Sequence, residues 1–414
     1  MKKIYFTLLI TFTIWGARLP SFRIPGVGNV YLIRALVIVT IIYMLFVLAK
    51  RKKIVFTKMQ KSTSIFLFVT MIWSALCFAW TPSNASYIAS MFTYLTSFAI
   101  LIITMQFIQE KEILNFCEKV FLLNVIVVLA LAIYESFTGN YFILTYDSYM
   151  QQRNSLGLYK PLATFYNINN LGTFLALATP ISCNAIFQFK KRKNICKFLF
   201  LIINTFVILL TNSRGALLAI IIFIILDFKN NFSTKKTILY GVILAITLLF
   251  FSNMLFESSL GELLTMDILE EGRIEIWKET LETISRYRFM GIGPGNTVYA
   301  NLNSSHYKYT FGTPHNYFLE YLGDFGIICF AILIHWIYVL MKKSKYISLD
   351  SNKQWSYKAK NYYAYYIMFI ILTICPSTMS TFQYLWLIFG FTVAMIDIYV
   401  REERNKECQE QVNH

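Results

Sequence analysis

"ALVIVTIIYMLFVLA", residues 35–49, is an apolar run of a kind that recurs along the whole chain. A second run, "GALLAIIIFIILDF", covers residues 215–228. Hydrophobic residues make up 57% of the 414 residues and charged residues 14%, whereas soluble domains carry roughly 25% charged residues. A soluble fold of this composition would expose too much apolar surface to water. The sequence therefore predicts a polytopic membrane protein.

Several segments are long enough to cross a bilayer as helices, which takes about 20 apolar residues. The prediction is an all-α bundle of about twelve transmembrane helices, forming a single membrane domain over residues 1–414. The first segment follows "MKK", and "GARLPSF" after it is a poor cleavage site, so we expect an uncleaved span. The candidate spans lie near residues 4–19, 30–49, 63–80, 87–107, 113–136, 165–188, 195–212, 214–229, 237–253, 315–341, 359–376 and 380–399.

The basic residues indicate an orientation. The net charge is +16, and in membrane proteins Lys and Arg accumulate in cytoplasmic loops. Clusters at 50–53, 190–193, 235–236 and 342–345 all fall on the side of "MKK" if there are twelve spans. We therefore expect both termini in the cytoplasm, including the tail 400–414, and no nucleic-acid partner. The seven cysteines form no C-x-x-C pattern, so neither a metal site nor a disulfide framework is expected.

One predicted outward loop is far longer than the others. Residues 254–314 lie between spans 9 and 10, and loops of this length are uncommon without a function. Within it, "GRIEIWKETLETISRYRF" spaces Ile274, Trp277, Leu281 and Ile284 by three or four residues. This spacing predicts an amphipathic helix on the bundle or at the membrane interface. "GIGPGN" at 291–296 is expected to be a tight turn, since a nucleotide-binding loop needs a strand and helix around it.

Cations gather on the predicted outer side, where the positive-inside rule does not explain them. Arg214, Arg273, Arg286 and Arg288 are joined there by Arg153 and Lys160 of the loop near 137–164. The planar guanidinium donates paired hydrogen bonds to phosphate oxygens, so this set suits a phosphate or diphosphate. Arg214 has an alternative role as an anchor at the membrane surface.

A polar cluster opens the tenth span in "FGTPHNYFLEYLGDFG", residues 311–326. His315 is a candidate general base, or a residue that only begins the helix. Glu320 and Asp324 lie one turn apart and either orient an acceptor or pair with an arginine. Asn167 and Asn170 in "TFYNINNLG" either bind sugar hydroxyls or cap a helix. His335 falls deep in the predicted span, where a packing or interhelical role is expected.

Three motifs in order carry a family resemblance over roughly residues 200–340. They are "TNSRGALLA", "GRIEIWKETLETISRYRFMGIGPGN" and "PHNYFLEYLGDFG". Together they resemble the O-antigen ligase/O-antigen polymerase family. The resemblance implies a GT-C-like integral membrane glycosyltransferase that takes a glycan from undecaprenyl diphosphate. It would act on the extracytoplasmic face of the bacterial cytoplasmic (inner) membrane. Ligases pass the glycan to lipid A-core, and polymerases pass it to the next repeat unit.

The resemblance also implies residue roles. Arg214 and Arg273 match the arginines that contact the lipid diphosphate, and Arg288 is a further candidate at a position where family members vary. His315 matches the histidine near the acceptor hydroxyl, so His315 and Arg273 are the candidate catalytic residues. Neither metal nor cofactor is expected. We assign Asn316, Asn167, Asn170 and Glu320 to the acceptor sugar.

Polymerase is the preferred function, because surface-polysaccharide gene clusters outnumber single ligases. A ligase is the alternative, and a source without lipopolysaccharide would exclude it. A lipid-glycan transporter is a third hypothesis, but it would carry ionisable residues near mid-membrane and two related halves. The expected partners are the undecaprenyl-diphosphate-linked oligosaccharide, an acceptor glycan, the bilayer and polysaccharide-assembly proteins.

Overall fold

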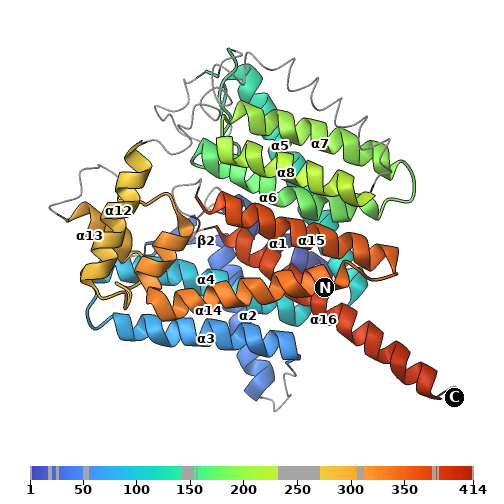
Figure 1. The fold of residues 1–414 in the computed structure, drawn as a ribbon, viewed down its shortest axis with the longest axis horizontal. Helices are drawn as coiled ribbons and strands as arrows, with labels where there is room; N and C mark the ends of the chain where they lie inside the picture. Colours follow the sequence, from blue (N-terminus) through green and yellow to red (C-terminus); the bar gives the residue numbers. More distant parts are fainter. Residues whose placement is uncertain are drawn as a thin grey trace. The chain divides into compact units, whose positions relative to one another are not determined.

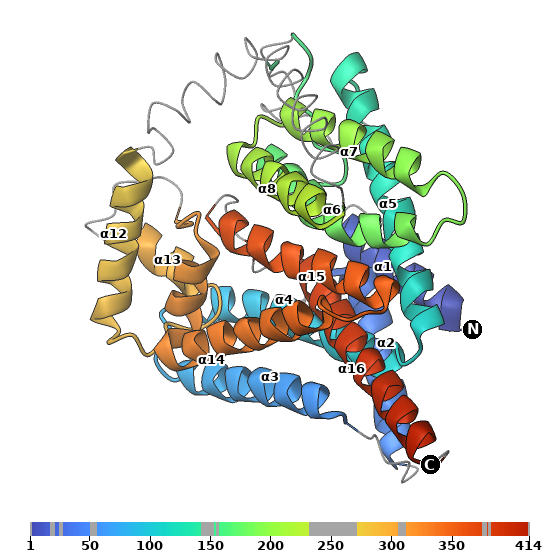
Figure 2. The same ribbon diagram turned by 45° about the vertical axis from the view of Figure 1, so that its right-hand side comes forward.

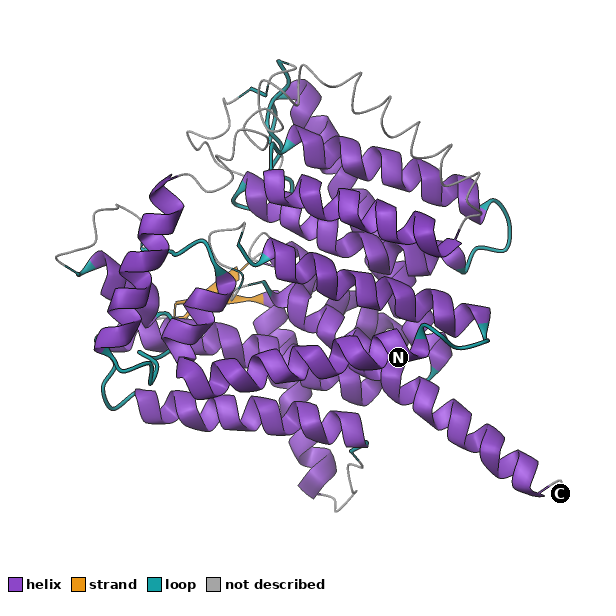
Figure 3. Ribbon diagram, in the orientation of Figure 1, coloured by secondary structure: helices purple, strands orange, loops and turns teal. Residues whose placement is uncertain are grey.

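The computed structural model is predominantly helical, as Figure 3 shows. It describes residues 2–16, 21–24, 28–49, 56–141, 153–154, 157–231, 271–304, 312–374, 379 and 382–412. The predicted span 237–253 and part of the predicted loop 254–314 lie outside these residues. The chain divides into two compact units, which are described separately. Unit 1 consists of Met1–Val120, Trp277–Ala359 and Thr378–His414, and unit 2 of Phe121–Ile276 and Lys360–Ser377.

The helices follow the apolar segments of the sequence. Along the chain they are α1 (Lys2–Trp15), α2 (Leu32–Ala49), α3 (Lys58–Cys77), α4 (Asn84–Phe107), α5 (Lys111–Thr138), α6 (Ile168–Phe187), α7 (Lys193–Leu210), α8 (Arg214–Asn231), α12 (Glu271–Arg286), α13 (Asn296–Leu302), α14 (Tyr317–Ile347), α15 (Lys353–Leu372) and α16 (Gln383–Val412). Figures 1 and 2 show them from two sides.

The prediction of a helical membrane protein is confirmed. Among the described residues, six helices are long and apolar enough to cross a membrane: α4, α5, α6, α7, α14 and α16. Helices also occupy the predicted spans that correspond to α1, α2, α3, α8 and α15. The full number of twelve spans and the outward position of the loop remain predictions.

A short hairpin between α1 and α2 was not predicted. Strand β1 (Ser21–Ile24) pairs antiparallel with β2 (Gly28–Tyr31), with Ser21 opposite Tyr31. Strands of four residues are too short to leave a clear alternating pattern in the sequence. The hairpin follows the end of α1 at Trp15, where the prediction had continued the first span to residue 19.

Unit 1 is organised around α14 and α16, which pack against α3, α4 and each other. The Trp336 ring stacks on Phe66 of α3 at 4.7 Å and meets Phe389 of α16 edge-on at 5.2 Å. Its indole N–H donates to the Thr63 hydroxyl over 3.1 Å. Because this hydrogen bond lies inside an apolar cluster, it fixes the rotation of α14 against α3 as well as the distance between them.

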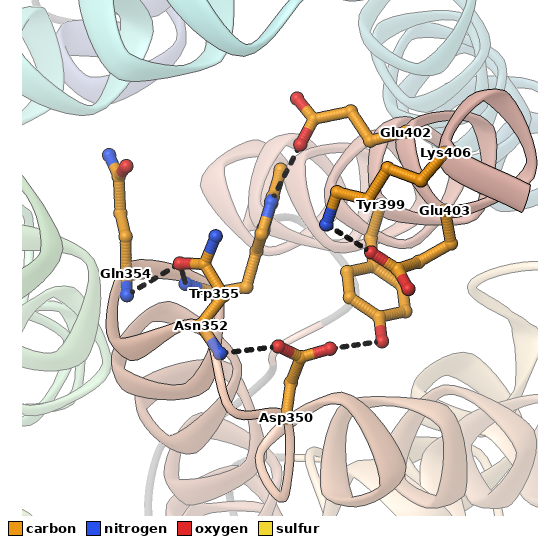
Figure 4. A network of polar contacts seen from close by, with 8 residues as sticks. All are labelled: Asp350, Asn352, Gln354, Trp355, Tyr399, Glu402, Glu403 and Lys406. Atoms are coloured by element: carbon orange, nitrogen blue, oxygen red, sulfur yellow. Dashed lines mark hydrogen bonds and ion pairs between the residues drawn. The ribbon is translucent and has the colours of Figure 1, made fainter. Parts of the chain in front are cut away.

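The turn between α14 and α15 is joined to α16 by a polar network, drawn in Figure 4. Asp350 accepts hydrogen bonds from the Tyr399 hydroxyl at 2.5 Å and from the Asn352 backbone N–H at 2.6 Å. The Trp355 indole donates to Glu402 at 2.8 Å. These contacts connect the end of α14, the start of α15 and the C-terminal half of α16 within unit 1.

Unit 2 contains α6 packed against α7 and α8, which lie side by side in Figures 1 and 2. Asn204 of α7 donates to the Thr179 hydroxyl of α6 at 2.9 Å. Lys197 of α7 donates to Asp227 of α8 at 2.6 Å. Polar pairs of this kind hold helices together where neighbouring lipid provides no hydrophobic driving force.

Candidate functional site

The backbone at His315 adopts an unusual conformation. His315 has φ +49°, in the left-handed region that residues other than glycine rarely adopt. On its C-terminal side, Asn316 caps α14, with its side-chain oxygen accepting from the N–H groups of Phe318 (3.0 Å) and Leu319 (3.2 Å). On its N-terminal side, the Pro314 carbonyl accepts from the Trp277 indole at 2.9 Å. The half-buried histidine is therefore held between two fixed residues, and strain of this kind clusters at functional sites.

A second contact holds the chain just before His315. Asn301 of α13, a fully buried residue, donates through its amide to the Gly312 carbonyl at 2.9 Å and to the Thr280 hydroxyl at 3.0 Å. One side chain thus joins α12, α13 and the segment that leads to His315, all within unit 1. The sequence contains no signal for this role, because its partners are remote along the chain.

The glycine-rich segment 291–296 forms a turn packed on the start of α14, as predicted. Its backbone runs beside α14: the Ile292 N–H donates to the Gly323 carbonyl, and the Gly293 N–H donates to the Asp324 backbone carbonyl. At Gly326, φ is +75°, and a Cβ would lie 2.5 Å from the Met290 carbonyl carbon. A side chain at this position would collide with backbone, so glycine is required for the contact.

Among the described residues Asp324 pairs with no arginine, although such a pair was one of the two roles predicted for it. Its side chain accepts from the Gly295 N–H at 2.8 Å, the Thr297 N–H at 3.1 Å and the Thr297 hydroxyl at 2.7 Å. These donors lie at the N-terminus of α13, where backbone N–H groups lack partners within the helix. Asp324 is therefore a buried cap of α13. Glu320, one turn earlier, is also buried, with 4% of its surface exposed.

Helix α12 confirms the predicted helix, whose apolar stripe was expected on the bundle or at the membrane interface. Its most buried side chains are Ile276 at 3% exposure, Thr280 at 0% and Ile284 at 1%. Of the predicted stripe, Ile274 and Leu281 are exposed at 38% and 39%. The face buried in the protein therefore differs from the apolar stripe, because Thr280 packs inside through its methyl group.

Two of the candidate arginines belong to unit 2 and lie on different helices. Arg273, half-buried on α12, donates to the Ile374 carbonyl at 3.1 Å, which uses one of the five N–H groups of its guanidinium. Arg214 is the first residue of α8, where the unpaired N–H groups and the helix dipole also favour an anion. The guanidinium of Arg273 is thus held by a backbone carbonyl, and Arg214 lies at a helix N-terminus.

The candidate asparagines open α6 in the same unit. Asn167 caps α6, and its side-chain oxygen accepts from the Asn169 N–H at 2.7 Å. The buried Oδ1 of Asn170 accepts no hydrogen bond from the described residues. At Gly172, a Cβ would lie 2.8 Å from the Ser213 side chain, so the first turns of α6 approach the residue before Arg214. Unit 2 therefore brings the asparagines of α6 close to the start of α8.

The other two arginines predicted on the outer side, Arg286 and Arg288, lie in unit 1 and are exposed. Arg286 ends α12 and donates to the Ser304 hydroxyl at 3.2 Å. Arg288 follows with φ +53°, and Phe289 with φ +57°, so two residues in succession are left-handed. Nearby, the indoles of Trp73 in α3 and of Trp80 in the turn after it donate to the carbonyls of Met290 (2.8 Å) and Gly291 (2.7 Å) and hold this segment. Within the described ranges, no three His, Cys, Asp or Glu side chains gather as a metal site would require.

Comparison with known families agrees with the resemblance that the three motifs carry. Residues 199–334 match the family model described as O-antigen ligase, whereas no curated protein matches the chain. The matched residues include Arg214, Arg273 and His315, and they cover most of the region of the three motifs. The resemblance seen in the sequence is confirmed over residues 199–334, where this membrane protein matches the O-antigen ligase model, and this match supports the O-antigen ligase/polymerase family.

Proposed function

We propose that this protein is a surface-polysaccharide polymerase that transfers a glycan from undecaprenyl diphosphate to the next repeat unit. The match of residues 199–334 to the O-antigen ligase model supports glycan transfer of this kind. The frequency of polymerases in surface-polysaccharide gene clusters favours a polymerase over a ligase. In the reaction, an acceptor hydroxyl oxygen bonds to the anomeric carbon of the donor. The bond from that carbon to the diphosphate breaks, and undecaprenyl diphosphate leaves with the electron pair. The hydroxyl proton passes to a base on the protein.

The proposed reaction takes place on the extracytoplasmic face of the bacterial cytoplasmic membrane. Arg214 and Arg273 would bind the diphosphate, and Arg288 would add a third cation. Fixed guanidinium groups stabilise the charge that develops on a leaving diphosphate, because they need no reorganisation during the reaction. The contact of Arg273 with the Ile374 carbonyl and the position of Arg214 at the start of α8 support this role.

His315 would act on the acceptor, as the base that takes the hydroxyl proton. The left-handed backbone at His315 and the two contacts beside it support a functional role for this side chain. Asn316, Glu320, Asn167 and Asn170 would contact acceptor sugar hydroxyls, and the buried Oδ1 of Asn170 supports this for one of them. In this proposal the arginines supply positive charge and His315 accepts the proton, and neither a metal nor a cofactor takes part.

Analysis of glycans in a strain that lacks the gene tests the proposal. A polymerase deletion accumulates single repeat units on undecaprenyl diphosphate and loses long chains. Expression of the gene in that strain should restore the chain-length distribution. Unchanged polysaccharide and unchanged lipid-linked glycans would contradict any role in this pathway.

Ligase activity is the second candidate, because the matched family model is that of O-antigen ligases. A ligase deletion accumulates long chains that remain on undecaprenyl diphosphate, and lipid A-core stays unmodified. The length of the accumulated lipid-linked glycan therefore separates the two functions in one experiment.

A further inference from the structure

The segment that leads into α14 leaves the backbone before His315 little freedom. Gly312 packs on α13, where a Cβ would lie 2.3 Å from the Val298 carbonyl oxygen. Thr313 follows, and a residue before proline is restricted to extended conformations. Pro314 then fixes its own φ at about −65° through its ring. The chain therefore reaches His315 along a path that packing and local steric contacts set.

Trp277 of α12 holds the peptide bond that joins Pro314 to His315. Its indole N–H donates to the Pro314 carbonyl at 2.9 Å, within unit 1. Because a peptide bond is planar, the direction of this carbonyl also sets the direction of the His315 N–H. The φ of His315, +49°, is a rotation away from this plane. Trp277 therefore fixes the plane from which the left-handed residue starts.

The residue after His315 is held by α14. The Asn316 backbone carbonyl accepts from the Glu320 N–H at 2.9 Å, and the Asn316 side chain caps the helix. The chain is thus fixed on both sides of the His315 Cα, and the tetrahedral geometry of this carbon sets the direction of the Cα–Cβ bond. Residues outside His315 therefore determine the direction in which its imidazole leaves the backbone.

The left-handed conformation of His315 depends on this support. A residue other than glycine keeps such a conformation only where the surrounding structure holds it. Loss of the indole hydrogen bond releases the Pro314 carbonyl, so the peptide plane can rotate and φ can return to negative values. A catalytic group displaced by about 1 Å can cost about 10²-fold in rate. The indole N–H of Trp277 is thus placed to control the base without touching it.

We propose that Trp277 is a positioning residue for glycan transfer: its indole N–H holds the peptide plane before His315 and thereby aims the imidazole at the acceptor hydroxyl. This inference rests on the proposed role of His315 as the base. Trp277 takes no part in the bonds that form and break, and the acceptor proton still passes to His315. The sequence placed Trp277 in an apolar stripe, whereas this role depends on its N–H group.

Transfer by purified protein in lipid nanodiscs tests the inference, with an undecaprenyl-diphosphate-linked repeat unit as substrate. Trp277→Phe keeps an aromatic ring and removes the N–H. We expect kcat to fall by up to about 10²-fold, with little change in KM, because the groups proposed to bind the substrate are untouched. Trp355→Phe is the matched control. It loses an indole hydrogen bond of 2.8 Å to Glu402, beyond the C-terminal end of α14, and should keep the wild-type kcat.

A double-mutant cycle separates positioning from a general effect on the fold. In the His315→Ala background, Trp277→Phe should cause no further loss, because the effects of residues that act as a unit are not additive. A second replacement at position 277 is 3-benzothienylalanine, which has sulfur in place of the indole N–H and keeps the shape of the side chain. It should lower kcat as Trp277→Phe does. Unfolding temperatures show that each variant is folded.

The outcomes distinguish this inference from the proposed function. A fall in kcat that requires the His315 imidazole would support the positioning role. Wild-type kcat in folded protein with either replacement, or the same fold loss with and without the imidazole, would overturn the inference and leave the proposed function in place. No transfer by the folded wild type would overturn both.

Discussion

His315 combines a chemically useful side chain with a strained backbone, and the two contributions can be separated. Glycine adopts positive φ without strain, so His315→Gly removes the imidazole and relieves a conformation that costs of order 1–3 kcal/mol. We expect this variant to fold as well as the wild type. Its activity should fall about 10²–10⁴-fold, the usual contribution of a general base.

Polysaccharide length in the complemented deletion strain measures this activity, and thermal unfolding in detergent measures the fold. His315→Ala is the companion variant, since it loses the imidazole but keeps the strained backbone. Long polysaccharide from His315→Gly would show that the residue has only a structural role.

At the scale of elements, Asp324 connects the glycine-rich turn, α13 and α14. Asp324→Ala leaves the Gly295 N–H, the Thr297 N–H and the Thr297 hydroxyl without their acceptor. Each unsatisfied buried group costs about 1–3 kcal/mol. We therefore expect a clear fall in the unfolding temperature. Glu282→Ala, at an exposed position of α12, is the control and should change little; equal stability of the two variants would contradict the capping role.

The junction of α14, α15 and α16 should respond to pH through Asp350. Hydrogen bonds from the Tyr399 hydroxyl and the Asn352 N–H lower the pKa of Asp350 below its ordinary value. A carboxylate whose pKa is lowered by folding stabilises the protein above its unfolded pKa of about 3.9, and this stabilisation is lost as the pH falls through the folded pKa. Asp350→Asn should therefore unfold at a lower temperature than the wild type at pH 7, with the difference closing below about pH 4.

Thermal unfolding of both proteins between pH 3 and pH 7 checks this expectation. Glu407→Gln, also on α16 and exposed, is the control for removing one carboxylate. If the unfolding temperatures of Asp350→Asn and the wild type differ by the same amount at every pH, the charge of Asp350 is not the cause of the difference.

The elements were easier to predict than the contacts between them. The lengths of the apolar runs located α3 to α8 and α14 to α16, because a helix that crosses a bilayer needs a run of about 20 apolar residues. The periodicity of α12 predicted a helix, but it could not reveal that Thr280 and Ile276 are more deeply buried than Leu281 and Ile274. The role of Asp324 was beyond sequence pattern, since its partners Gly295 and Thr297 lie 29 and 27 residues away.

At the scale of the whole molecule, the orientation in the membrane is the first prediction to test. The positive-inside pattern places residue 299 outside and residue 345 inside, and both side chains are exposed. Single cysteines at Tyr299 and Lys345, in a chain without its native cysteines, should react differently with a membrane-impermeant maleimide. We expect labelling at 299 in intact cells, and at 345 only after the membrane is opened. The reverse result would contradict the topology and an extracytoplasmic site.

The central claim is that the protein transfers a glycan from undecaprenyl diphosphate, and purified protein can test it directly. The protein in lipid nanodiscs is given an undecaprenyl-diphosphate-linked repeat unit, and the released undecaprenyl diphosphate and the glycan length are measured together. Arg273→Ala is compared with Lys278→Ala, an exposed position on the same helix. Our account predicts longer glycan with matching release of undecaprenyl diphosphate, a loss of about 10²–10³-fold in Arg273→Ala and little change in Lys278→Ala. No transfer by the folded wild type, or equal transfer by Arg273→Ala, would contradict it.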